Sequence, residues 1–184
     1  MIITLAAMGQ RREIGKNGQL LWRLPSDLKF FHRFTSIGRG MLMGSKTFES
    51  LPRILPGREH YVLTRDPKKL KELIAEKPGD KQLVHAVTDL DKFVCDWKES
   101  RPAEDLLFVI GGGMVYWETL KYVDACFISE VKAEDLDADA FFPELPEKEW
   151  ERVEGDEIFE DGDEVPYRRI TYYRKEIHGK RFRF

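Results

Sequence analysis

One carboxylate in a short apolar stretch is the residue whose type and spacing point most directly to chemistry. Asp27 follows Pro25 and Ser26 at the start of a predicted helix, and Phe31 comes four residues later. Residues four apart share a helix face, so the acid and the aromatic ring would line one pocket. Such a pair suits a flat, basic, nitrogen-rich ligand. Alternatively, Ser26 and Asp27 only begin the helix, where a carboxylate complements the helix dipole.

Three consecutive glycines form a second candidate site. Gly111, Gly112 and Gly113 lie between an apolar run and a predicted helix that begins at Met114. Glycine lets the backbone approach a ligand closely, and the first N–H groups of the helix point to the same place, which is a phosphate-binding geometry. The dinucleotide fingerprint would need glycine at Tyr116, so that motif is absent. A tight turn is the alternative, although a turn alone does not require three glycines.

A second junction of strand and helix has the same character. Gly44 follows an apolar strand, and Ser45, Lys46 and Thr47 open the next helix. The segment differs from a P-loop because one residue separates the glycine from the lysine, so we exclude an NTPase. Two anion sites in one α/β domain suit a ligand with separated phosphates, such as a dinucleotide.

Two arginines stand where they could bind acidic groups. Thr64 and Arg65 end a third strand, and ligands of open parallel sheets lie at the carboxyl ends of strands. Arg58 follows the Pro56-Gly57 turn, and arginine holds a carboxylate through two parallel hydrogen bonds that lysine cannot copy. Either arginine could instead be a solvated residue of a surface loop.

The elements that must position these residues alternate between strand and helix. The predicted strands are Ile2–Met8, Gly40–Met43, His60–Thr64, Gln82–Ala86, Leu106–Ile110, Ala125–Val131, Trp150–Ile158 and Arg168–Arg174. The predicted helices are Ser26–Thr35, Ser45–Leu51, Pro67–Glu76, Asp89–Glu99 and Met114–Lys121. This alternation predicts a mostly parallel α/β sheet. The last two strands have only a turn at 160–163 between them, which predicts an antiparallel hairpin at one edge.

The composition indicates one soluble domain. The chain has 184 residues, of which 42% are hydrophobic and 34% charged, and no apolar run approaches the roughly 18 residues of a membrane span. The apolar start of the chain predicts a buried strand rather than a signal peptide. Cys95, Cys126 and four scattered histidines provide no disulfide framework and no zinc motif, so we expect no metal.

Charge is divided unevenly along the chain. Residues 134–164 hold 15 acidic residues against Lys148 and Arg152, which leaves the remainder of the chain basic despite the net charge of −3. A basic body can attract anionic small molecules. Nucleic acid is not expected, because no run of Lys and Arg interleaved with aromatic residues occurs outside the tail. The acidic stretch and residues 66–105 read as solvated surface.

In order and spacing, these segments resemble the dihydrofolate reductase family over nearly the whole chain. The matching segments are Leu5-Ala6-Ala7, Ile14-Gly15, Leu20-Leu21-Trp22, Leu24-Pro25-Ser26-Asp27-Leu28, Phe31, Met43-Gly44, Thr47–Leu51, Leu55–Arg58, Ile110–Gly113, Val115-Tyr116 and Asp139–Pro143. The resemblance implies an eight-stranded mixed sheet flanked by helices. It implies a reductase domain over residues 1–175, followed by a tail extension over 176–184.

The resemblance also implies an activity: reduction of 7,8-dihydrofolate to tetrahydrofolate by hydride transfer from NADPH, which supplies one-carbon metabolism and thymidylate synthesis. We therefore expect a cytoplasmic monomer that binds dihydrofolate and antifolate inhibitors. By the same resemblance, Asp27 would bind the amidine edge of the pterin and Trp22 would position a nearby water. Ser129 would join that network, and Leu20 would help to bracket the nicotinamide.

The remaining site residues are likewise implied by the resemblance. The substrate pocket would be lined by Leu5, Ala6, Ala7, Leu28, Phe31, Leu51, Leu55 and Ile110, with Arg58 on the glutamate tail. The cofactor would lie against Ala7, Ile14, Gly15, Asn17, Gly18, Gly44, Ser45, Lys46, Thr47, Thr64, Arg65, Ile110, Gly111, Gly112, Gly113, Met114, Val115 and Tyr116. Residues 9–24 would form a mobile loop that closes over the nicotinamide.

Three positions depart from the family pattern. Leu21 stands where many relatives have proline, Ser45 where arginine is common, and Ser129 where threonine is more frequent. Two other functions remain as alternatives. A pyrimidine reductase of riboflavin synthesis has no use for Asp27, Phe31 and Arg58 together, because its substrate has neither a pterin nor a glutamate tail. An inactive homologue would not need to retain Asp27, Trp22 and the three glycines.

Overall fold

The computed structural model describes residues 1–102 and 104–175, so the predicted tail at 176–184 lies outside the described residues. The strands are β1 (Ile2–Met8), β2 (Glu13–Gly15), β3 (Gly40–Gly44), β4 (Glu59–Leu63), β5 (Val84–Val87), β6 (Leu107–Val109), β7 (Ala125–Val131), β8 (Ala140–Phe141), β9 (Trp150–Ile158) and β10 (Tyr167–Arg174). The helices are α1 (Pro25–Ile37), α2 (Ser45–Ser50), α3 (Pro67–Glu76), α4 (Leu90–Ser100) and α5 (Gly113–Thr119), with 3₁₀ turns η1 (Lys81–Leu83) and η2 (Leu120–Tyr122).

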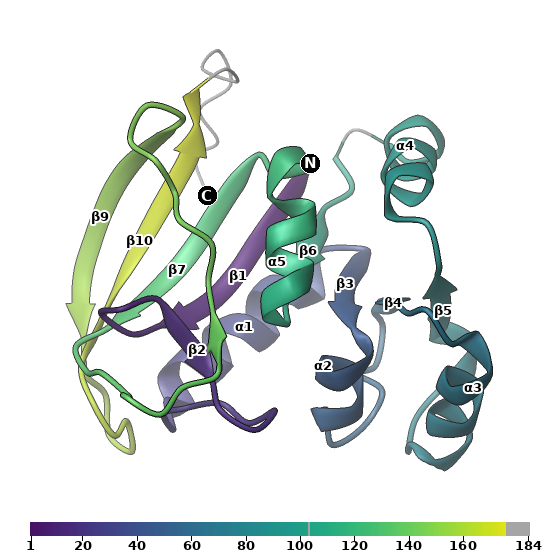
Figure 1. Cartoon of the computed structure of the whole chain (residues 1–184), viewed down its shortest axis with the longest axis horizontal. Coiled ribbons are helices and arrows are strands. Elements are labelled where there is room, and N and C mark those ends of the chain that lie inside the picture. The colour runs from purple at the N-terminus through teal and green to yellow at the C-terminus, as the bar shows by residue number, and fades with distance from the viewer. Residues whose placement is uncertain (103, 176–184) are drawn as a thin grey trace.

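In the described part of the chain, eight strands form one sheet in the order β5-β4-β3-β6-β1-β7-β10-β9 (Figure 1). The pairs from β5 to β7 are all parallel, whereas β10 is antiparallel to both β7 and β9. The continuous apolar runs of β1, β3 and β6 are buried, as expected for parallel strands covered on both faces. The predicted mixed sheet and C-terminal hairpin are confirmed.

Helices cover both faces of the sheet. Figure 1 shows α5 in front of the central strands and α1 behind them. On the α1 face, the Phe34 ring packs edge-on against Phe108 and Phe127, at centroid distances of 5.9 and 5.2 Å. On the other face, Tyr116 of α5 and Trp97 of α4 belong to a separate buried cluster. Helices α1, α4 and α5 therefore each bury apolar side chains against the sheet.

Two short strands were not predicted. β2 and β8 pair in a small antiparallel sheet, but they are three and two residues long and too short to give an alternating pattern. The predicted start of β5 at Gln82 was also wrong. Lys81–Leu83 form a 3₁₀ turn instead, because the Asp80 carboxylate accepts the Gln82 N–H at 3.0 Å and caps that turn.

Candidate active site

The first turn of α1 holds Asp27 beside the carboxyl end of β7. Pro25 begins the helix, where its fixed φ angle suits the first position. Asp163 anchors this turn from the β9–β10 connection, because its carboxylate accepts the Ser26 N–H at 3.0 Å and the Ser26 hydroxyl at 2.6 Å. The Ser129 hydroxyl then donates to Asp27 Oδ1 at 2.5 Å. Asp163 therefore anchors the turn that carries Asp27, and Ser129 holds one oxygen of its carboxylate.

The Asp27 carboxylate has lost most of its contact with water. Its side chain is 20% exposed, and this burial raises its pKa above the ordinary aspartate value. The hydrogen bond from Ser129 and the positive charge of Arg169 lower the pKa, and the negative charge of Asp163 raises it. A carboxylate in this setting gains from a ligand that offers N–H donors and positive charge.

A row of residues crosses the sheet beneath Asp27. Ala7 of β1 pairs in register with Ser129 of β7, and Ser129 pairs with Arg169 of β10. Paired residues lie on the same face, so the row faces α1. Arg169 Nη2 lies 3.9 Å from Asp27 Oδ1. The sequence analysis missed Arg169, because the strand register that brings it to the site cannot be seen in the sequence.

Apolar residues close the site from the sides. Leu5, Phe31, Leu51, Leu55 and Ile110 all lie in the single cluster on the α1 face of the sheet, as the predicted substrate pocket requires. Leu55 is held in place by its backbone N–H, which donates to His60 Nε2 at 3.1 Å. Leu28, in the same turn of α1 as Asp27, is 45% exposed.

Arg58 is a buried cation near the same cluster. It is 6% exposed, and its guanidinium donates to Thr35 Oγ1 at 2.8 Å and to the Pro56 carbonyl at 3.2 Å. Both partners are neutral, and among the described residues no carboxylate forms an ion pair with Arg58. Burial and the nearby Arg53 lower its pKa. An anionic group would relieve this buried charge, which fits the predicted carboxylate ligand.

The loop of residues 9–24 is tied to the segment around β8. Ile14 and Gly15 lie in β2, and the Asp139 N–H donates to the Gly15 carbonyl at 3.1 Å. Glu13, which the sequence analysis did not select, is fully buried and accepts the Arg11 N–H at 2.7 Å and the Asp135 N–H at 3.0 Å. These bonds fix the base of the loop against a second segment.

The tip of the same loop is open. Leu20, which was predicted to help to bracket the nicotinamide, is 71% exposed. Asn17 and Gly18 adopt left-handed backbone conformations at the exposed turn. Trp22 is half-buried, and its ring lies so close to Gly9 that a Cβ on Gly9 would be 2.5 Å from Trp22 Cη2. The loop residues are therefore divided between a fixed base and an exposed tip.

The two glycine junctions lie side by side. The Gly44 N–H donates to the Gly111 carbonyl at 2.8 Å. No side chain caps the helix that follows Gly44 or the helix that follows Gly112, so backbone N–H groups of both first turns remain available. Gly111 has φ of +117°, a conformation that side chains rarely adopt. Behind it, the buried Tyr116 hydroxyl donates to the Leu5 carbonyl at 2.8 Å.

The sequence analysis predicted that these junctions hold the pyrophosphate and nicotinamide of a dinucleotide. A Cβ on Gly113 would lie 3.3 Å from the Phe141 carbonyl, so a side chain there would narrow the space between α5 and β8. At the neighbouring strand ends, Ser45 Oγ donates to the Leu63 carbonyl at 3.3 Å, and Thr64 Oγ1 accepts the Asp66 N–H at 3.0 Å. Lys46, Thr47, Met114 and Val115 complete the predicted set on α2 and α5.

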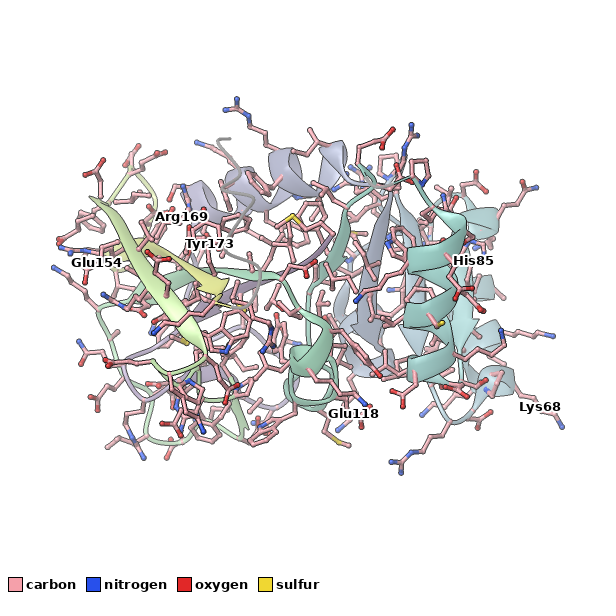
Figure 2. The ribbon with its side chains drawn as sticks, turned by 90° about the horizontal axis from the view of Figure 1, so that it is seen from above. Lys68, His85, Glu118, Glu154, Arg169 and Tyr173 are labelled. Atoms are coloured by element: carbon pink, nitrogen blue, oxygen red, sulfur yellow. The ribbon has the colours of Figure 1, made fainter. Side chains whose placement is uncertain are left out.

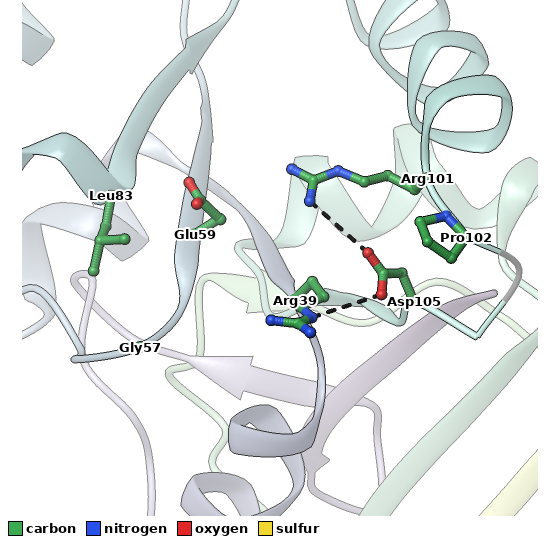
Figure 3. Close-up of a pocket in the computed structure, with 7 residues that line it drawn as sticks. All are labelled: Arg39, Gly57, Glu59, Leu83, Arg101, Pro102 and Asp105. Atoms are coloured by element: carbon green, nitrogen blue, oxygen red, sulfur yellow. Dashed lines mark ion pairs between the residues drawn. The ribbon is translucent and has the colours of Figure 1, made fainter.

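A separate pocket of about 410 Å³ lies at the amino-terminal ends of the parallel strands, opposite the strand ends that carry the candidate site (Figure 3). Arg39 and Arg101 lie 3.7 and 3.8 Å from the carboxylate of Asp105, which both arginines share. None of the predicted site residues lines it. In the described part of the chain there is no group of three or more potential metal ligands, and no helix is long and apolar enough to cross a membrane.

Comparison with known proteins finds similar sequences over most of the chain. Residues 1–174 match the family model described as Dihydrofolate reductase. The chain is 35% identical to a dihydrofolate reductase of Bacillus subtilis, over 91% of this chain and 89% of that protein. It is 36% identical to one from Haemophilus influenzae, over 78% of this chain and 79% of the relative. A dihydrofolate reductase type 3 from Salmonella typhimurium is 30% identical over 84% and 85% of the two chains.

Proposed function

The chain belongs to the dihydrofolate reductase family, and we propose that the residues gathered around Asp27 carry out that family's reaction in this protein. The reaction reduces 7,8-dihydrofolate to tetrahydrofolate, and NADPH is the hydride donor. The observation that carries the proposal is the half-buried Asp27 carboxylate, held by Ser129 beside an apolar cluster.

Asp27 binds and orients the substrate. Its carboxylate accepts two parallel N–H bonds from the amidine edge of the pterin, an arrangement that strengthens as positive charge develops on the ring. This favours the protonated, electrophilic imine. Because Asp27 holds the edge remote from the reacting nitrogen, the proton comes through water, which Trp22 helps to position. Ser129 keeps the carboxylate oriented through its 2.5 Å hydrogen bond.

The other residues position the two reactants. Phe31, Leu51 and Leu55 hold the ring and its linker in an apolar environment, and Arg58 binds the glutamate tail. NADPH supplies a hydride when it is bound, and the chain provides no nucleophile of its own. Gly111, Gly112 and Gly113, which have no side chains, would let the cofactor lie close to the pterin, so that the two reactants are held near each other in a suitable orientation.

The proposal also assigns the residues that would bind the phosphates of the cofactor. The first turns of α2 and α5, which no side chain caps, would hold the phosphate oxygens of the cofactor through their backbone N–H groups. Lys46, Thr64 and Arg65 are assigned to the 2′-phosphate, with Ser45 standing where relatives often have arginine. The proposal also includes a reductase domain over residues 1–175 with an extension over 176–184, and a cytoplasmic monomer; these three points rest on the family resemblance.

A paired assay tests the function. The purified protein is mixed with dihydrofolate and either NADPH or NADH, and oxidation of the reduced nicotinamide is followed by its absorbance. We expect turnover that depends on dihydrofolate and is faster with NADPH. A folded protein that binds NADPH but does not turn over dihydrofolate would contradict the assigned reaction. Methotrexate soaked into crystals should place its diamino edge on Asp27.

A further inference from the structure

Among residues 1–102 and 104–175, Arg169 is the cation that forms an ion pair with the proposed substrate-binding carboxylate. It projects from β10 on the face that meets α1 (Figure 2), and its Nη2 atom is 3.9 Å from Asp27 Oδ1. That distance is too long for a direct hydrogen bond but short for an interaction between opposite charges. The Arg169 side chain is 26% exposed, so solvent screens this attraction only in part.

The guanidinium is held from several directions. Its central carbon lies 3.7 Å from the centre of the Phe30 ring, and Nη2 donates to the Tyr167 hydroxyl at 3.1 Å. Tyr167 is in turn bonded to the Ser26 hydroxyl at 2.8 Å, and Ser26 is anchored by Asp163. A continuous chain of contacts therefore links both sides of Asp27. Stacking on an aromatic ring and a planar fork of donors suit arginine better than lysine.

The backbone under Arg169 is fixed as well. The pairing of β9 with β10 shifts register between Arg168 and Ile170, so Arg169 lies at a bulge. A Cβ on the facing Gly155 would lie 2.6 Å from the Arg169 carbonyl oxygen, which shows how closely the two strands approach there. Bulges re-aim side chains next to functional sites. The register thus determines where the Arg169 guanidinium can lie.

The other groups that face Asp27 do not replace this cation. Ser129 of β7 gives a neutral hydroxyl, and Tyr167 of β10 is a phenol whose pKa is raised by burial. Tyr116 of α5 belongs to the cluster on the opposite face of the sheet, and burial raises the pKa of its phenol as well. Asp163, in the β9–β10 connection, is negative and opposes ionisation of Asp27. Within the described residues, Arg169 is the one positive charge that lowers the pKa of Asp27.

We propose that Arg169 is a positioning residue for the reduction, which supplies the counter-charge that keeps Asp27 ionised before the substrate binds. The inference rests on the proposed role of Asp27 as the group that binds the pterin. Because Arg169 remains 3.9 Å away, it stabilises the charge without taking the place of the N–H donors that the pterin brings. Ser129 sets the direction of one oxygen, and Arg169 supplies the counter-charge.

The test compares Arg169→Met, Arg169→Lys and wild type by carbon-13 NMR of the aspartate carboxyl groups in the ligand-free protein. The Asp27 signal is assigned by its loss in Asp27→Asn. Removing a positive neighbour makes ionisation harder, so Arg169→Met should raise the titration midpoint by about one pH unit. Arg169→Lys, which retains the charge, should recover at least half of that shift. The midpoint of the pH profile of kcat/KM should move in the same direction.

Arg168→Met is the matched control. Arg168 is the preceding residue on β10. It forms an ion pair with Glu154 of β9, which is labelled in Figure 2. This variant should leave the Asp27 midpoint unchanged. If Arg169→Met does not fold, Arg169→Gln, which keeps an N–H donor for Tyr167, replaces it with the same expected rise.

An Asp27 midpoint in folded Arg169→Met within about 0.2 units of wild type would overturn the inference, because an opposite charge close to a carboxylate shifts its pKa by about 1–3 units. A loss of stability without a change in midpoint would likewise show that Arg169 is only structural. This outcome differs from failure of the proposed function, which would appear as full dihydrofolate turnover by Asp27→Asn. The NMR titration needs no turnover, so the two results are independent.

Discussion

The two ends of the candidate site are built from different parts of the polypeptide. At the pterin end, Asp27 is held by side chains of β7 and β10, through Ser129 and Arg169. At the cofactor end, the contacts are backbone groups, and Gly44 and Gly111 join the two junctions through a main-chain hydrogen bond. Under the proposed function, one end would recognise its ligand by charge, and the other end by shape and by backbone N–H groups that no side chain caps.

This difference predicts that substitutions at the two ends impair the protein in different ways. A substitution at the pterin end removes or adds a charge and can leave the fold intact. A substitution at the cofactor end adds a Cβ where backbone strands meet, so it disturbs stability and ligand binding together. Variants at each end should therefore separate in a plot of activity against stability.

The largest effect is expected for Asp27→Asn. Loss of the charged hydrogen bonds to the pterin should reduce kcat/KM by an amount equivalent to about 2–4 kcal/mol, measured with dihydrofolate and saturating NADPH. The loss should be greater at neutral than at acidic pH, because the solution protonates more substrate at low pH. Activity similar to wild type at pH 7 would remove Asp27 from its assigned role.

The same variant should move stability in the opposite direction. Burial raises the pKa of Asp27 in the folded protein above its unfolded value, so the folded state binds more protons. Stability then falls as pH rises from the unfolded pKa through the folded pKa, and the loss is complete above it. We expect Asp27→Asn to be more resistant to urea than wild type at pH 7, with the difference shrinking in acid. A uniform loss of stability at all pH values would be inconsistent with this sign.

At the cofactor end, Gly111→Ala should lower the free energy of unfolding by about 1–3 kcal/mol, because the position has a left-handed φ angle that side chains rarely adopt. The added Cβ would also lie 3.1 Å from the Tyr116 hydroxyl oxygen. Urea unfolding and NADPH affinity should therefore change together. Gly57→Ala is the control, since Gly57 has φ of +69° but nothing within 4 Å of its Cβ position. Equal losses of NADPH affinity in both variants would argue against the predicted glycine site.

Much of the fold follows from local pattern. The buried runs of β1 and β7 and the helix over Pro67–Glu76 were predicted with the observed bounds, because apolar periodicity and helix caps act within a few residues. The pairing of β2 with β8 could not be predicted in this way. It depends on segments more than 120 residues apart, and neither has enough residues to show a periodic pattern.

The residues of the candidate site also differ in whether a local sequence pattern could reveal them. Asp27 and the glycines could be found because their signals are local: an acid at a helix start, and glycines between a strand and a helix. Arg169 and Glu13 could not be found, since what matters about them is the partner across the fold. Arg169 follows an arginine in a strand of mixed polarity, and only the register with Ser129 shows which of the two faces α1. Charge alone does not distinguish a buried arginine from an exposed one.

A smaller effect should follow from Ser129→Ala. Removing the hydroxyl takes away a hydrogen bond that lowers the pKa of Asp27, so the pH profile of kcat/KM should move to higher pH. The loss of kcat/KM at pH 7 should correspond to about 1 kcal/mol, or roughly fivefold. Ser129→Thr keeps the hydroxyl and should behave like wild type. If both variants lose activity equally, packing rather than hydrogen bonding explains the role of Ser129.

The smallest effect is expected for Arg65, a charged residue at the periphery of the cofactor end. Arg65 is exposed after β4, and among the described residues it forms no ion pair. An exposed arginine that meets the 2′-phosphate of NADPH is screened by solvent, so Arg65→Ala should raise KM for NADPH by only about three- to fivefold. KM for NADH, which has no such phosphate, should not change. Lys68→Ala, an exposed cation on α3, should affect neither cofactor. Equal increases of KM for NADPH and NADH in Arg65→Ala would show that Arg65 does not bind this phosphate. The cofactor end would then recognise its ligand by shape and backbone groups alone.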